Sequence, residues 1–98
     1  MSEVRVTIEY FAQARAAAGG QGRETLSVTA ATPICEVIRR VADKHGPRLS
    51  SLLLNPDGTL SHSTVVAVDG VQVSPGQDLT LHGGETVTII PPISGGQP

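Results

Sequence analysis

The residues best suited to chemistry stand at the end of the chain, in the run TVTIIPPISGGQP from Thr86 to Pro98. The pair Pro91-Pro92 stiffens the exit from an apolar, strand-like segment and cannot extend the hydrogen-bond ladder of a sheet. Beyond it stands Gly95-Gly96, and from the second proline to the second glycine the chain reaches at most about 14 Å. A tail this slender can thread a narrow channel in another protein, and a glycine carboxylate meets little steric resistance to attack or transfer.

The other reactive side chains form no recognisable catalytic or metal site. Cys35, His45, His62 and His82 lack the close C-x-x-C or H-x-x-H spacing of metal ligands. Cys35 stands near the start of an expected helix, where a small buried thiol is commoner than a reactive one. We interpret His45 as a cation at a helix C-terminus, and His62 and His82 as loop residues. The sequence therefore predicts no catalytic site of its own, no metal and no bound cofactor.

Composition narrows the range of partners. The 98 residues are enough for one domain and carry a formal charge of -2 without a cluster of Lys and Arg, so a nucleic-acid partner is not expected. The longest apolar runs are far too short to span a bilayer, and the N-terminal residues lack the basic and apolar regions of a secretory signal. A single cysteine fits a reducing compartment. We expect a soluble cytoplasmic protein with no membrane partner.

The alternation of apolar and polar residues in the N-terminal third of the chain predicts a hairpin. Val4, Val6 and Ile8 alternate with polar residues, which is the period of a half-buried strand, and residues 25–28 resume the same alternation. Between them, residues 11–19 could form some helix, and a glycine-rich connector follows.

The next segment predicts the main helix. Thr32 suits the N-cap and Pro33 suits the first helical position, where its missing N–H costs nothing. Gly46 can close the helix in a left-handed conformation, and Pro47 prevents its continuation. The apolar face is formed by residues at helical spacing, namely Ile34, Val37, Ile38, Val41 and Ala42.

The rest of the chain predicts short strands and turns. They are a possible helical turn at Ser50 to Leu54, a turn at Asn55 to Gly58, a hairpin from Val65 to Val73 through Asp69-Gly70, a short strand or bridge at Leu79 to Leu81, and a final strand from Thr86 to Ile90. One helix cannot cover both faces of a sheet, so we expect an α+β domain with the helix packed on one face of a mixed sheet. That arrangement is a β-grasp or a close α+β relative. It would span residues 1–92, with residues 93–98 as a flexible C-terminal tail.

Both ends of the chain resemble the MoaD/ThiS family of small sulfur-carrier proteins, and the MoaD branch in particular. The N-terminal motif matches at Phe11, Ala12, Arg15 and Gly19. The C-terminal motif matches at Gly84, Glu85, Val87, Pro91, Pro92, Ile93, Gly95 and Gly96. The middle of the chain resembles the family in the pattern of its elements. The resemblance also implies a β-grasp fold, in agreement with the elements predicted from the residues alone.

The resemblance implies a mechanism in which Gly96 carries the reactive group. A partner that resembles ubiquitin-activating enzymes consumes ATP to adenylate the glycine carboxylate, and sulfur then replaces the adenylate to give a thiocarboxylate. In the MoaD branch the tail delivers this sulfur inside the large subunit of molybdopterin synthase. Gly95 would give the tail its slender approach, and Pro91, Pro92 and Ile93 would direct it and contact the partner. Phe11 is a candidate surface anchor, with a core aromatic as the alternative.

One feature departs from the family pattern, because Gln97-Pro98 follow the glycines. A peptide carbonyl at Gly96 cannot be adenylated, so we expect a protease, such as one of the JAMM type, to remove these two residues. Three alternatives remain open from the sequence. The chain could carry sulfur for cysteine, thiamin or specialised metabolites, it could be a ubiquitin-like protein modifier, or it could be a non-reactive β-grasp interaction module.

Overall fold

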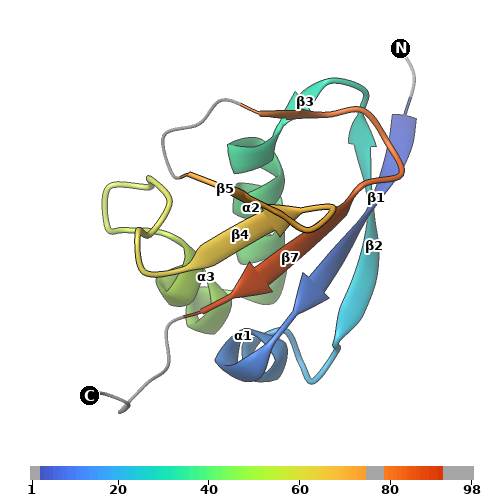
Figure 1. Ribbon diagram of the computed structural model, residues 1–98. Coiled ribbons are helices and arrows are strands. Elements are labelled where there is room, and N and C mark those ends of the chain that lie inside the picture. The colour runs from blue at the N-terminus through green and yellow to red at the C-terminus, as the bar shows by residue number, and fades with distance from the viewer. Residues whose placement is uncertain (1–2, 75–78, 92–98) are drawn as a thin grey trace.

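Alternating apolar residues build a five-stranded sheet in the computed structural model, which describes residues 3–74 and 79–91 (Figure 1). The order of the strands across the sheet is β2-β1-β7-β4-β5. The strands are β1 (Glu3–Tyr10), β2 (Arg23–Thr29), β4 (Val65–Val68), β5 (Val71–Val73) and β7 (Thr86–Ile90). The two predicted hairpins, β1–β2 and β4–β5, are both confirmed as antiparallel pairs.

The centre of the sheet joins the two ends of the chain. β1 and β7 pair in parallel, with Ile8 opposite Val87 and Tyr10 opposite Ile89, and all four side chains are buried. β7 also pairs with β4 in the antiparallel sense. The sheet is therefore mixed, as predicted, and the strand that leads to the C-terminal tail lies at its centre.

Among the described residues, helices α2 (Ile34–His45) and α3 (Pro47–Leu53) lie against one face of this sheet, and the short helix α1 (Ala12–Ala17) stands at the end of β1 (Figure 1). All five apolar residues predicted to face the core from α2 are buried. A helix of this kind on one face of a mixed sheet is the β-grasp arrangement expected from the sequence.

The predicted start of α2 was wrong by one residue. Pro33 occupies the N-cap with extended backbone angles, and the helix begins at Ile34. Thr32 does not cap the helix, because its hydroxyl donates to the carbonyl of Thr29. The physical reason is a second, two-stranded sheet, in which β3 (Thr32–Pro33) pairs with β6 (Thr80–Leu81) and holds these residues extended.

Pro47 ends one helix but also begins the next. The sequence predicted only a helical turn from Ser50 to Leu54, whereas α3 begins at Pro47, which needs no N–H partner at a first helical position. Gly46 makes the junction with a φ of 90°, and its carbonyl accepts the first hydrogen bond of α3 from Ser50 at 3.0 Å. Leu49 and Leu53 of α3 are buried, so burial of these leucines extends the helix beyond its local signal.

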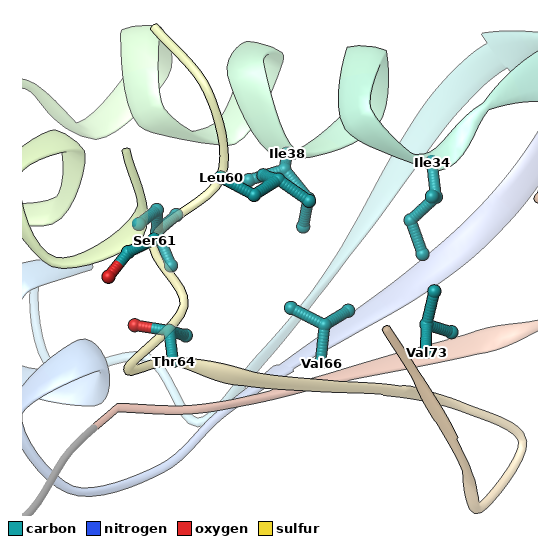
Figure 2. A pocket seen from close by; sticks show the side chains of 8 residues that line it. Ile34, Ile38, Leu60, Ser61, Thr64, Val66 and Val73 are labelled. Atoms are coloured by element: carbon teal, nitrogen blue, oxygen red, sulfur yellow. The ribbon is translucent and has the colours of Figure 1, made fainter. Parts of the chain in front are cut away.

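A small apolar cavity remains between α2 and the β4–β5 hairpin, with a volume of about 10 Å³. Figure 2 shows Ile34 and Ile38 pointing from the helix toward Val66 and Val73 on the strands. The Thr64 hydroxyl at its edge already donates to the Leu52 carbonyl at 2.6 Å. The cavity therefore offers space to an apolar group.

We expect Val66→Ile to stabilise the protein by up to about 1 kcal/mol, because it adds one buried methylene to an under-filled part of the core. The measurement is the midpoint of urea unfolding. The matched control is Val65→Ile on the other face of the same strand, which is expected to change the free energy of unfolding by less than about 0.5 kcal/mol. A lower midpoint for Val66→Ile would show that the cavity is too small for the added group.

Candidate functional site

The exit of the chain from the sheet is the part of the predicted site that the structure describes. β7 ends at Ile90, and Pro91 follows as a buried residue, so the chain leaves from the central strand through a proline that packs against the protein. The remaining predicted site residues lie outside the described residues, and their roles stay predictions. They are Pro92, Ile93, Gly95, Gly96, Gln97 and Pro98.

Phe11 lies beside this exit. Its backbone N–H donates to the carbonyl of Ile89 at 3.2 Å, which continues the β1–β7 pairing by one residue. The Phe11 side chain is 49% exposed. The side chain is therefore not the core aromatic that the sequence left open as an alternative, and the role of Phe11 as a surface anchor stays a prediction.

Phe11 belongs to a row of apolar residues on the outer face of the sheet. Tyr10 and Ile89 point inward, and successive strand residues alternate in direction, so Phe11 and Ile90 point outward. Ile90 is 41% exposed, and on its other side it pairs with Val65 of β4, which is partly exposed. We call Phe11, Ile90 and Val65 the outer apolar patch. It lies where the central strand ends.

A polar row follows the patch along the same face. The carboxylate of Glu9 accepts hydrogen bonds from Arg23 on β2 and, at 3.2 Å, from the hydroxyl of Thr88 on β7. The bond from Arg23 is the main cause that lowers the pKa of Glu9, so this surface carboxylate stays ionised. A protein that docks on this face therefore meets apolar side chains at the exit and a paired carboxylate next to them.

The segment after Phe11 contains two features that the sequence pattern did not reveal. Ala12 has a φ of 52°, a conformation that is strained for a residue with a Cβ atom. The side-chain oxygen of Gln13 is buried, and it has no hydrogen-bond donor among the described residues. Both follow Phe11 directly in the chain. Neither feature had a signal in the sequence, because a positive φ at alanine and a buried amide oxygen have no local signature.

The other candidate residues are dispersed. Cys35 is half-buried in the first turn of α2, while His62 and His82 are exposed, in line with the loop positions predicted for them. His45 stands in the last turn of α2, as predicted, and it also contacts a buried carboxylate that the sequence did not indicate. Its Nε2 atom lies 2.5 Å from a carboxylate oxygen of Glu24, and its side chain is only 10% exposed.

Within residues 3–74 and 79–91, no group of three or more His, Cys, Asp or Glu side chains is placed to hold a metal ion. Within the same ranges, no helix is both long and apolar enough to cross a bilayer.

Comparison with known proteins agrees with the motifs at the two ends of the chain. The model of the ThiS family matches residues 8–96. The molybdopterin synthase sulfur carrier subunit of Mycosarcoma maydis is 34% identical over 92 residues, which cover 93% of this chain and 92% of that protein.

Solved structures show the same fold. SAMP1 from Haloferax volcanii superposes with a TM-score of 0.79 at 23% identity, covering 94% of this chain and 99% of that one. A chain in the BexX/CysO complex of Amycolatopsis orientalis superposes with a TM-score of 0.66 at 27% identity, covering 93% and 99%. The fold, the family match and the sequence identity to the Mycosarcoma maydis protein agree with one another. The chain belongs to the ThiS family, the small sulfur carriers of the ThiS/MoaD type that its terminal motifs resemble.

Proposed function

We propose that this protein carries sulfur as a thiocarboxylate on Gly96 and donates it in the synthesis of molybdopterin. The observation that carries the proposal is the family match, which ends at Gly96 itself. The relative from Mycosarcoma maydis, named as a molybdopterin synthase sulfur carrier subunit, supports the choice of pathway. The exit of the chain beside the outer apolar patch supports a tail that works inside a docked partner.

The chemistry requires an activation step, because a free carboxylate is a poor electrophile. Attack of a Gly96 carboxylate oxygen on the α-phosphate of ATP forms an acyl adenylate and releases pyrophosphate. A sulfur donor then attacks the acyl carbon, and AMP leaves with the electron pair of the broken C–O bond. The resulting thiocarboxylate is a better and softer nucleophile than the carboxylate. The partner enzymes supply the catalytic groups, and the carrier supplies a reachable carbonyl.

The proposal names three kinds of partner. An adenylyltransferase that resembles ubiquitin-activating enzymes consumes ATP and activates Gly96. The large subunit of molybdopterin synthase accepts the sulfur. A protease of the JAMM type removes Gln97-Pro98 beforehand, because these residues tie the Gly96 carbonyl into a peptide bond.

The outer apolar patch is the surface that we propose for docking. Phe11 and Ile90 are large apolar side chains that remain exposed in the isolated chain. They lie at the end of β7, the strand that leads to the tail. A partner that covers them gains apolar burial and places its active site within reach of Gly96. The polar row of Glu9, Arg23 and Thr88 would then set the orientation of the complex.

The test is sulfur transfer in a purified system. A chain that ends at Gly96 is converted to the thiocarboxylate and mixed with the large subunit and the pterin precursor, and molybdopterin is expected to form. A chain that ends at Gly95 is the control and is expected to yield none. If the thiocarboxylate forms but the precursor is not converted, the pathway is a different one. If no thiocarboxylate forms on Gly96, the carrier function itself is wrong.

A further inference from the structure

A buried cluster of polar side chains joins the ends of three elements on the inner side of the sheet. Glu24 of β2 is its centre, with a side chain only 5% exposed. One carboxylate oxygen accepts a hydrogen bond from Lys44 at 2.6 Å, and the other contacts both the hydroxyl of Tyr10 and His45 Nε2. The Tyr10 and His45 rings also meet edge to face, with centroids 5.7 Å apart. We call these four residues the Glu24 cluster.

The ionised form of Glu24 suits this arrangement, because its oxygens accept hydrogen bonds from the Lys44 ammonium and the Tyr10 hydroxyl, while the role of His45 Nε2 depends on its tautomer. Burial alone would raise the pKa of Glu24, but the hydrogen bonds from Lys44, Tyr10 and His45 outweigh it and hold the pKa below its usual range. Burial, together with the Glu24 carboxylate, raises the pKa of Tyr10, which keeps the phenol protonated as a donor. Protonation of Glu24 would turn one acceptor oxygen into a donor facing other donors.

The cluster lies directly before the strained turn that displays Phe11. Tyr10 is the last residue of β1, and its ring is held on the inner side, while Phe11 points outward. Ala12 follows with its φ of 52°, and Ala14 is then buried with its N–H bonded to the Phe11 carbonyl at 3.1 Å. A strained conformation persists only where its surroundings hold it on both sides. Here the Tyr10 hydroxyl and the buried Ala14 hold the two sides, in addition to the backbone hydrogen bonds of Tyr10 to Gly22 and of Phe11 to Ile89.

We propose that the Glu24 cluster is a positioning device that holds the Tyr10–Ala12 turn and so keeps Phe11 displayed beside the exit of the chain. Tyr10 and Glu24 are its positioning residues. Because Lys44 contacts the other oxygen of Glu24 and its side chain is 51% exposed, Lys44 contributes less to holding the turn. Any effect of this device on partner binding rests on the docking role proposed above for Phe11. The device itself is a property of the isolated chain.

Hydrogen exchange of backbone amides tests the proposal on the full chain without any partner. Tyr10→Phe removes one hydroxyl and keeps the ring, so we expect the amides of Phe11 and Ala14 to exchange at least about tenfold faster. Amides of β4, which lie away from the cluster, are expected to change much less. Lys44→Met is the control within the cluster and should accelerate the Phe11 amide less than about fivefold. Equal acceleration at Phe11 and in β4 would overturn the proposal, because the cluster would then act on global stability alone.

The pH dependence provides a second readout that a purely apolar contact would not give. A carboxyl group with a lowered pKa in the folded state stabilises that state above its unfolded pKa, and the contribution is lost as the pH falls through the folded value. The charged or titratable groups that contact Glu24 are Tyr10 from β1 and Lys44 and His45 from α2. We therefore expect the Phe11 amide to lose protection from exchange, relative to the amides of β4, as the pH is lowered past about 4.5, the ordinary pKa of a glutamate.

Glu24→Gln is expected to abolish this relative acid response, because the amide does not titrate in this range. The matched control is Glu36→Gln, which removes an exposed carboxylate of α2 that pairs with Arg40. That variant is expected to keep the response of the parent chain. If Glu24→Gln keeps the response as well, or if the Phe11 amide shows no acid response in the parent chain, the Glu24 cluster does not hold the turn.

Discussion

A chain that ends at Gly96 is expected to exchange one carboxylate oxygen for sulfur when it is incubated with its activating enzyme, ATP and a sulfur donor, whereas the full-length chain stays unchanged. The reason is chemical. In the full-length chain the Gly96 carbonyl belongs to the peptide bond with Gln97, which has no free carboxylate oxygen to attack ATP. The expected difference is therefore complete conversion against none, and intact-mass spectrometry measures it directly.

Two controls make this result specific to the tail. A chain that ends at Gly95 retains the described domain and a glycine carboxylate, but its carbonyl lies one residue short, so we expect little or no conversion. A full-length chain treated first with a protease that removes Gln97-Pro98 should regain conversion. If the untreated full-length chain gains sulfur, or if the chain ending at Gly96 does not, removal of the last two residues is not the activating step.

The second large effect is expected at the outer apolar patch. We expect Phe11→Asp to weaken binding to the activating enzyme by at least about thirtyfold, the size of an interface hot spot of about 2 kcal/mol. The change replaces a large apolar side chain beside the exit with a charge that would have to lose its hydration in the complex. Titration calorimetry with the purified enzyme measures the affinity.

This effect should be separable from stability. Phe11 is 49% exposed, so the free energy of unfolding is expected to change by less than about 1 kcal/mol. The control is Val71→Asp, at an apolar residue that is 69% exposed at the start of β5 and outside the patch. It should leave the affinity within about twofold of the parent chain. Equal losses for both variants, or none for Phe11→Asp, would place the docking surface elsewhere.

Much of the fold could be predicted because its signals are local. The period of two residues indicated the strands, and the Asp69-Gly70 pair indicated the β4–β5 hairpin, where both residues do have a positive φ. The apolar face of α2 was predictable for the same reason, since its spacing matches the helical repeat. What failed was the start of α2, because β3 pairs with β6 from a distant part of the chain and overrides the local capping preference of Thr32.

The candidate site also has parts that could be predicted from the sequence and parts that could not. The glycine pair and its proline exit are contiguous, so their chemistry could be inferred from order alone. The exposure of Phe11 could not, because Tyr10 and Phe11 are adjacent aromatics, and only the register of β1 on β7 decides which one points inward. The Glu24 cluster could not be predicted either, since its members come from β1, β2 and the end of α2.

By itself, the sequence determined most of the elements, the fold class and the family resemblance, because each depends on residues close together in the chain, and it predicted a reactive tail at Gly95-Gly96. The tertiary structure alone decided which side chains share a surface or a hydrogen-bond network. It placed Phe11 beside Ile90 at the exit, and it brought His45, at the end of α2, into contact with the buried carboxylate of Glu24. The physical reason is that pairing register and packing bring distant residues into contact, and no local pattern encodes those contacts.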